Sequence, residues 1–316
     1  MGKHLIGVQT KGIFSEPPKA EEVALIRRAG FDCIDFSLDA FLLNSDIYRG
    51  ELNDFFSCSE QDFLDIFRPL KETLKKEGLR ISQMHVPYPL WILDPENDRT
   101  EQNEYIRKEV LPKSFALAKL LEIPFLVLHS IKCRGLSGYS AELRKNVEFF
   151  RELIPNARMA DTIICLENLY GGFAGRLTDG PCSDPEEAKR YLEELNSAAG
   201  EERFGFCLDT GHMNLVHRSA REFTETLGKH IKILHIHDNN GKEDLHQLPF
   251  SFRDPEGKGG GVDWEEWIEA MKEIGYEGAL SFETFPCMNA FPPELQEAAL
   301  RAICGIGRYF ASRLGA

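Results

Sequence analysis

The sequence predicts a single (β/α)8 TIM barrel, an α/β fold, over residues 1–316. Short apolar segments alternate eight times with longer segments in which apolar residues recur at three- and four-residue steps. This alternation predicts parallel strands joined by right-handed helical crossovers, and eight such units are the number that closes a barrel. No linker or change in composition divides the chain, so we expect one domain. A doubly wound sheet is the alternative, but no GxGxxG motif follows the first strand.

The predicted strands are short, apolar and rich in β-branched or aromatic residues. In order, they cover residues 5–9, 33–37, 80–85, 125–129, 163–167, 205–209, 232–237 and 279–283.

Helix signals separate these strands. Phe63, Phe67, Leu70 and Leu74 repeat at helical spacing, and residues 264–274 do the same. The segment Asp184-Pro185-Glu186-Glu187 supplies a helix N-cap, a first-turn proline and acidic residues. Four glycines are expected to end helices just before the next strand: Gly30, Gly78, Gly228 and Gly275.

The predicted connections differ in length between the two ends of the barrel. Helix-to-strand joins are short, whereas the loops at 39–59, 86–100 and 238–262 follow strands and are long. In a TIM barrel such strand-to-helix loops lie at the C-terminal face, where active sites are found. We therefore expect elaborated loops that form a lidded pocket for a small substrate.

Composition excludes several classes of protein. The chain has 42% hydrophobic and 28% charged residues, and no apolar run is long enough to span a membrane. Its net charge of −14 argues against nucleic acid or acidic lipid as the main partner. The eight cysteines form no CxxC pair, and the N-terminus has no apolar run of signal-peptide length, so we expect a cytoplasmic protein.

Metal-capable side chains stand at the C-terminal ends of six successive predicted strands. They are His85, His129, Glu167, Asp209, His235 or His237, and Glu283. A closed barrel brings these ends around one mouth, where uncompensated carboxylates would repel one another. A divalent ion removes that repulsion. Glu167, Asp209, His235 and Glu283 form a set of three carboxylates and one imidazole, which suits Mn²⁺, Mg²⁺ or Co²⁺, with Zn²⁺ as a further option. His237 shares the face of His235 and is expected at the rim.

The motifs around these residues resemble those of the xylose isomerase-like barrel superfamily. They are Cys165-Leu166-Glu167-Asn168, residues 208–214 (LDTGHMN), Leu234-His235-Ile236-His237-Asp238 and Ser281-Phe282-Glu283-Thr284. The superfamily includes sugar and sugar phosphate isomerases, ketose 3-epimerases, inosose dehydratases and endonuclease IV. The resemblance implies that Glu167, Asp209, His235 and Glu283 bind the metal. It further implies that Glu167 and Glu283 are the acid/base pair and that His212 contacts a substrate oxygen.

The resemblance is also compatible with a nuclease function. Endonuclease IV holds three zinc ions with nine ligands, and all nine have counterparts here; the additional ones are His85, His129, His212, Asp244 and His246. Two departures favour a sugar enzyme, because Leu169-Tyr170-Gly171-Gly172 replaces a Thr-Ala-Gly-type run and Gly211 replaces a cysteine. Duplex DNA also requires basic binding loops, yet Arg49 is the one base in residues 39–59.

The sequence therefore predicts a metal-dependent isomerase or epimerase of a sugar, sugar phosphate or related polyol. Proton transfer between two glutamates through a metal-stabilised cis-enediolate is the expected mechanism, with one divalent ion, Mn²⁺ first. Substrate contacts are expected from His85, His129, His212, Asp244, His246 and Trp91, with Phe14 and Phe250 as further candidates for packing on the sugar. The alternatives are an endonuclease IV-like abasic-site nuclease and an inactive sugar-binding relative. The sequence leaves open whether the protein forms a homo-oligomer.

Overall fold

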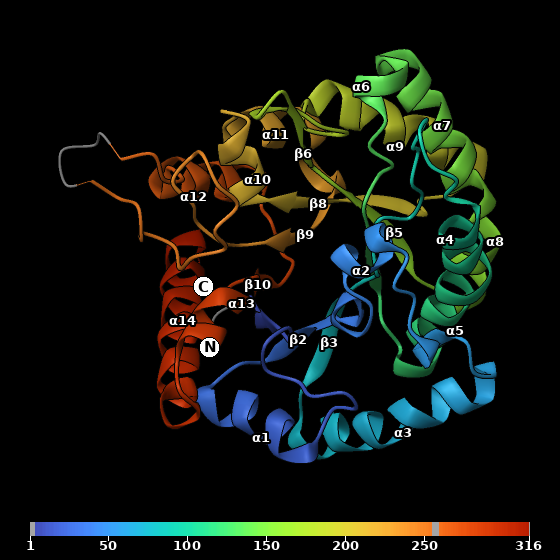
Figure 1. Ribbon diagram of the computed structural model, residues 1–316. Helices are drawn as coiled ribbons and strands as arrows, with labels where there is room; N and C mark the ends of the chain where they lie inside the picture. The colour runs from blue at the N-terminus through green and yellow to red at the C-terminus, as the bar shows by residue number, and fades with distance from the viewer. Residues whose placement is uncertain (1–3, 255–258, 316) are drawn as a thin grey trace.

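A computed structural model describes residues 4–254 and 259–315. Within these residues, eight parallel strands form one sheet that curls into a barrel (Figure 1). In the order of the sheet they are β10 (Leu280–Phe282), β1 (Ile6–Gln9), β2 (Cys33–Ser37), β3 (Arg80–His85), β4 (Phe125–Leu128), β5 (Ile163–Glu167), β8 (Phe204–Asp209) and β9 (Ile231–His235).

The barrel closes between β9 and β10 just beyond the end of β9. Ile236 forms a parallel bridge with Phe282. The amide of Ile236 donates to the carbonyl of Ser281 at 2.9 Å, and the amide of Glu283 donates to the carbonyl of Ile236 at 3.1 Å. The predicted TIM barrel is confirmed, and the alternative of an open doubly wound sheet is wrong.

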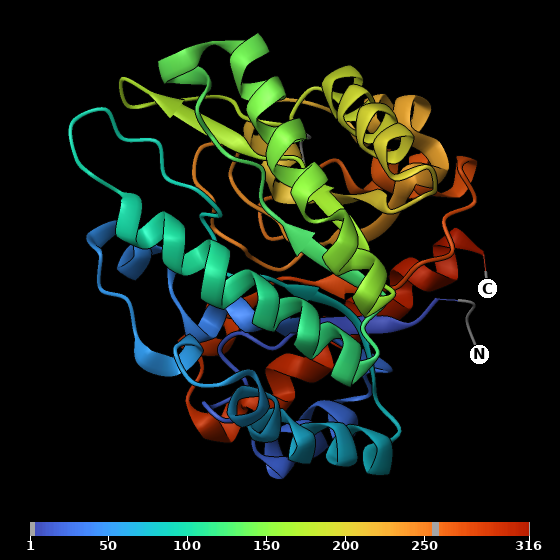
Figure 2. The same ribbon diagram turned by 90° about the vertical axis from the view of Figure 1, so that its right-hand side faces the viewer.

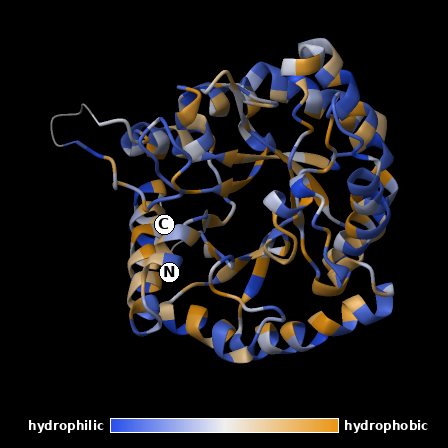
Figure 3. Cartoon of the chain, viewed as in Figure 1, coloured by the Kyte–Doolittle hydropathy of each residue, from blue (hydrophilic) through white to orange (hydrophobic). Residues whose placement is uncertain are grey.

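Helices surround this sheet and carry both hydrophobic and hydrophilic residues (Figures 1 and 3). The longer ones are α1 (Ala20–Ala29), α3 (Glu60–Glu77), α5 (Leu111–Leu121), α7 (Tyr139–Glu152), α8 (Ile154–Ala160), α9 (Pro185–Ala199), α11 (Ala220–Leu227), α12 (Trp264–Glu273) and α14 (Pro293–Leu314). Helix α4 (Thr100–Tyr105) continues into α5 through a π-helical turn, η3 (Ile106–Val110). The shorter helices are the 3-10 helices η1 (Leu38–Phe41), η2 (Asp54–Phe56) and η4 (Gly228–His230) and the α-helices α2 (Asn44–Arg49), α6 (Arg134–Ser137), α10 (Thr210–Leu215) and α13 (Phe285–Ala290).

The predicted helix boundaries have the expected chemistry. The carboxylate of Asp184 accepts from the amides of Glu186 and Glu187 at the start of α9. Gly30 and Gly78 end α1 and α3 in the left-handed region, with φ of 103° and 67°, where a glycine has no Cβ penalty.

Two features differ from the prediction. The strands predicted at 125–129, 232–237 and 279–283 end one or two residues earlier, although Ile236 still forms a parallel bridge with Phe282 beyond the end of β9. The loop after β5 contains an antiparallel hairpin, β6 (Tyr170–Phe173) and β7 (Arg176–Asp179), that the sequence analysis missed. Its residues are largely exposed, so they lack the apolar alternation by which strands are recognised.

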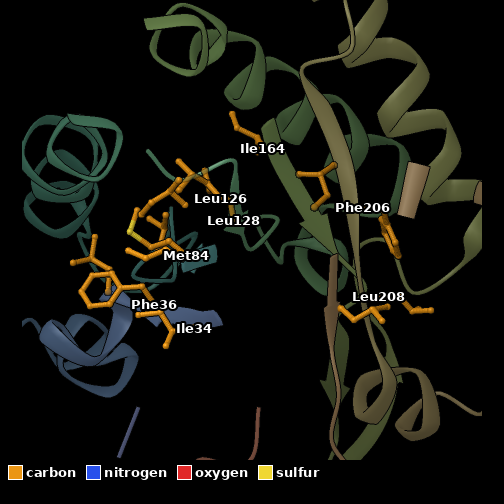
Figure 4. Packing of buried hydrophobic residues seen from close by; sticks show 14 of the residues in the cluster. Ile34, Phe36, Met84, Leu126, Leu128, Ile164, Phe206 and Leu208 are labelled. Carbon is orange, nitrogen blue, oxygen red and sulfur yellow. The ribbon is translucent and has the colours of Figure 1, made fainter. Parts of the chain in front are cut away.

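The alternation of side chains along each strand builds two layers. One set points outward and packs beneath the helices, as Ile34, Phe36 and Met84 do in Figure 4. The opposite set forms a separate apolar layer of Val127, Cys165, Cys207 and Ile233. Two residues further along each of these four strands stand His129, Glu167, Asp209 and His235. The period of two therefore places metal-capable groups directly above the apolar floor of the barrel.

The long strand-to-helix segments extend from one end of the barrel. Figure 2 shows α2, the loop that follows β3 and the β6–β7 hairpin projecting from the end opposite the two termini. Of the predicted loop 238–262, residues 255–258 lie outside the described residues. No helix in the described part of the chain combines the length and hydrophobicity that a membrane span requires.

Candidate metal and substrate site

Three carboxylates converge on the imidazole of His235 at the C-terminal end of the barrel. Its Nδ1 lies 3.2 Å from Oε1 of Glu167, 3.1 Å from Oε2 of Glu283 and 3.9 Å from Oδ2 of Asp209. Each of the four residues offers a ligand atom within 4.8 Å of the others, and all four side chains are buried. These are the four residues that the sequence nominated as metal ligands, brought together from three strand ends and the residue after β10.

Electrostatics within this cluster favour charged carboxylates. Burial alone would raise the pKa of Glu283, but the neighbouring imidazoles of His235 and His246 lower it to about 2. The pKa of Glu167 likewise lies well below its usual range, because His235 and His129 outweigh its burial. Burial would lower the pKa of His235, but the surrounding acids raise it well above 6.5. His235 therefore compensates the buried charges of Glu167 and Glu283 together with the other neighbouring imidazoles.

This donor set fits a divalent cation. Oε2 of Glu167 is buried and, among the described residues, accepts no well-aligned hydrogen bond, although Nε2 of His129 is 2.9 Å away. Buried polar atoms are normally satisfied, so such an oxygen is a natural ligand atom. Three carboxylates and one imidazole are a donor set for Mn²⁺, Mg²⁺, Co²⁺ or Zn²⁺.

Asp35 supports His235 from below, and the sequence analysis missed it. Its Oδ2 lies 3.1 Å from Nε2 of His235 and accepts from Nε2 of Gln83 at 2.9 Å. A carboxylate on the far nitrogen of an imidazole fixes its tautomer and orientation. The available signal was a charged residue on the inward face of an otherwise apolar strand, Cys33-Ile34-Asp35-Phe36.

A second cluster lies beside the first and consists of His212, His237, Asp244 and His246. Oδ2 of Asp244 is 3.4 Å from Nε2 of His212 and 3.2 Å from Nε2 of His246. Burial would raise the pKa of Asp244, but these two imidazoles lower it well below its usual range. The predicted contacts His212, Asp244 and His246 thus belong to one cluster that faces the pocket described below.

The expectation that His237 occupies the rim is wrong. Its side chain is fully buried, its Nε2 lies 3.0 Å from Oδ2 of Asp209, and its ring stacks on His246 at 3.9 Å between centroids. The chain after β9 continues parallel to β10 through the Ile236 bridge, which keeps position 237 inside the barrel mouth.

His85 and His129 flank Glu167 from the other side. Nε2 of His85 lies 3.1 Å from Nε2 of His129 and 3.8 Å from Oε2 of Glu167. Burial lowers the pKa of His129 to about 4, and Glu167 only partly opposes this, whereas acidic neighbours outweigh burial and raise the pKa of His85. His85 is thus enclosed beside the first cluster, and His129 lines the pocket.

The local fold of the motif residues fixes these groups. The amide side chain of Asn168 bonds to the backbone N–H and C=O of Asp209, both at 2.8 Å, so it ties the end of β5 to the end of β8. Asp209 then caps α10 by accepting from the amide of His212 at 2.6 Å. The motif therefore holds Asp209 and His212 on one rigid turn.

A pocket of about 660 Å³ opens beside the second cluster, and three residues of that cluster, His212, Asp244 and His246, line it. His129, His212, Asp244 and His246 line its inner end, together with two lysines, Lys11 and Lys132, that sequence reasoning did not single out. Lys132 lies over the ring of Tyr170, with its ammonium 4.7 Å from the ring centroid.

Of the three aromatic residues predicted to contact the substrate, Trp91 lies in the pocket, whereas Phe14 and Phe250 lie elsewhere. Trp91 lines the pocket, and the ammonium of Lys145 lies 4.5 Å above its ring. Phe14 packs against Phe36, and Phe250 packs among Trp264, Tyr309 and Phe310. Neither Phe14 nor Phe250 lines this pocket, and Phe250 lines a separate pocket beside Trp264.

Comparison with known proteins identifies related chains. The family model described as "Xylose isomerase-like TIM barrel" matches residues 23–304. An uncharacterized protein of Methanocaldococcus jannaschii is 31% identical over 189 residues, covering 57% of this chain and 58% of that protein. The chain thus matches less than two thirds of the length of the M. jannaschii protein. A match to an uncharacterized Sinorhizobium fredii protein covers 30% of that protein's length. The D-psicose 3-epimerase of Enterocloster bolteae is 24% identical over 269 residues, 81% of this chain and 73% of the enzyme. A solved L-ribulose 3-epimerase superposes with a TM-score of 0.66 at 18% identity, covering 98% and 96% of the two chains.

Proposed function

The chain belongs to the xylose isomerase-like TIM barrel family, and on that premise we propose that it is a divalent-metal-dependent isomerase or epimerase of a sugar, sugar phosphate or related polyol. One observation carries the proposal. The carboxylates of Glu167, at the end of β5, and Glu283, directly after β10, approach the same nitrogen of His235 at 3.2 and 3.1 Å. Two ionised carboxylates on either side of one ion site are the groups that a proton-transfer reaction at a sugar carbon requires. The related ketose 3-epimerases support the same class of reaction.

The residues that would hold the ion are Glu167, Asp209, His235 and Glu283. When bound there, a divalent ion would supply the positive charge that stabilises the oxygens of a cis-enediolate. Asp35 would keep Nδ1 of His235 directed toward the ion by holding the opposite nitrogen.

The two glutamates would move the proton. Nε2 of Gln9 donates to Oε1 of Glu283 at 2.8 Å, which orients this carboxylate, and its low pKa keeps it ionised as a base must be. One glutamate would take the proton from the carbon next to the carbonyl, and the other would return a proton, from the opposite face in an epimerase. His212, His246 and Asp244 would bind and orient the hydroxyl groups, because they line the pocket beside the carboxylates.

A second candidate, an abasic-site nuclease with several zinc ions, has its own supporting observation. His212, His237, Asp244 and His246 offer a second ligand set, and His85 with Glu167 and His235 offers a third. The charges of the loop at residues 39–59 argue against this nuclease function. Arg49, the one base in residues 39–59, is paired with Asp46 and Glu51 at 2.5 and 2.8 Å, so it is engaged rather than free for phosphate contacts.

A cytoplasmic location is part of the proposal. All eight cysteines are free thiols, and seven of them are buried. Free thiols throughout suit a reducing compartment.

The deciding experiment combines metal analysis with an activity screen. Chelated protein reloaded with Mn²⁺ is tested against free, phosphorylated and O-substituted ketoses, beside elemental analysis and an abasic duplex assay. We expect metal-dependent turnover of a sugar and one tightly bound ion per chain. Three zincs with abasic cleavage would establish the nuclease instead, and sugar binding without turnover would indicate an inactive relative.

A further inference from the structure

The pocket beside the second cluster is lined by two chemically different groups of residues. Its inner end is polar and contains His129, His212 and Asp244. Its outer wall comes from two segments far apart in sequence: residues 43–48, in and before α2, and residues 88–93, after β3. A volume of about 660 Å³ is in the range that takes ligands well beyond a single monosaccharide.

The outer wall presents several apolar side chains to the cavity, beside the polar residues Asn44 and Ser45. Leu43, Tyr48 and Leu93 leave 42%, 49% and 41% of their surfaces exposed, and Trp91 lies in the same wall. Apolar surface left in water is unfavourable, and a bound apolar group would cover it. Exposed apolar side chains that gather in one concave site mark a place where an apolar group binds.

The wall is also built to hold this shape. A guanidinium N–H of Arg99, near the end of the loop that follows β3, donates to the carbonyl of Tyr48 at 3.0 Å and ties this loop to α2. The side chain of Asn103 bonds to both the N–H and the C=O of Ile92, at 2.7 and 3.0 Å. Lys145 lies over the ring of Trp91. The backbone is thus fixed by polar contacts while the apolar side chains face the cavity.

We infer that the outer part of the pocket binds an apolar, ring-sized substituent of the substrate, so that the substrate is a sugar linked to an apolar group rather than a free ketose. The inference rests on the proposed function for the inner end. The same cavity is lined by Leu43, Tyr48 and Leu93 and by His129, His212 and Asp244. Its occupant therefore presents hydroxyl and carbonyl oxygens to one end and an apolar group to the other.

The test measures binding without requiring turnover. Phenyl β-D-glucoside and methyl β-D-glucoside are titrated calorimetrically into the Mn²⁺-loaded protein, because the two probes share the sugar and differ in the apolar group. We expect the phenyl glucoside to bind at least about tenfold more tightly, a difference of about 1.4 kcal/mol. The double variant Leu43→Ser/Leu93→Ser should reduce this ratio to near one. The control Leu295→Ser, at a residue of α14 that is 48% exposed and does not line the pocket, should leave it unchanged.

The outcomes separate this inference from the proposed function. Equal binding of the two glucosides, or a phenyl preference that survives in the double variant, overturns the apolar subsite even if the protein isomerises ketoses. A phenyl preference that the double variant abolishes supports the subsite even if no isomerase activity is found. If the wild type is a dimer that the double variant dissociates and no phenyl preference exists, a second copy of the chain covers this wall and the inference is wrong.

Discussion

Gly211 lies directly against the imidazole of His237, so that a Cβ at position 211 would overlap Cε1 of that ring. The same ring is held by Asp209, because its Nε2 lies 3.0 Å from Oδ2 of that carboxylate. A residue without a side chain on α10 is therefore what allows His237 to reach Asp209, one of the four proposed metal ligands.

Substituting Gly211 should weaken metal binding. In Gly211→Ala the new methyl group must push His237 away from Asp209, and loss of such a supporting partner typically lowers metal affinity about 10–100-fold. Competition titration with a metal indicator measures this. Gly305→Ala is the matched control, since a Cβ there meets no atom within 4 Å. Unchanged affinity in Gly211→Ala would show that His237 does not position Asp209.

Replacing the proposed base should abolish most of the activity. Glu283→Gln keeps an oxygen donor but removes the proton acceptor, so kcat should fall by about 10²–10⁴. Solvent deuterium incorporation at the substrate carbon should fall in parallel. Glu294→Gln, on the exposed start of α14, should retain full activity. Product formed by the wild type without any solvent deuterium would favour a hydride shift over an enediolate.

Removing the metal should lower stability. An ion that binds the native state at one hundred times its Kd raises the free energy of unfolding by about 2.7 kcal/mol. Urea unfolding of chelated and Mn²⁺-reloaded protein should show this gap, and Asp209→Asn should lose most of it. Identical unfolding midpoints with and without Mn²⁺ would mean that the four-residue cluster binds no such ion.

The chelated protein should lose stability as pH rises above neutral. Burial lowers the pKa of His246, but Glu283 and Asp244 outweigh it and raise the pKa from 6.5 to about 9. The resulting stabilisation is complete below pH 6.5 and is lost as pH rises through about 9. Melting temperatures between pH 6 and 10 should therefore decline, and His246→Gln should flatten the decline. His217→Asn, at an exposed histidine in a left-handed turn, should leave the profile unchanged, whereas an unaltered slope in His246→Gln would contradict the assignment.

Local pattern was sufficient to predict the barrel and the four candidate metal ligands at its C-terminal end. Strand identity follows from short apolar runs, and the period of two then places Glu167 and Asp209 on the inward face above Cys165 and Cys207. Closure of eight parallel strands brings their C-terminal ends together whatever their separation in sequence.

Only the tertiary structure decided the rest, because it depends on contacts between segments that have no fixed spacing in the chain. The burial of His237 follows from the Ile236 bridge to β10, and the role of Asp35 follows from its distance to His235 across the barrel. The apolar outer wall arises where α2 and the loop after β3 meet through Arg99. Loop conformations of this kind are set by side-chain contacts made after the barrel has closed, so no periodicity in the sequence encodes them.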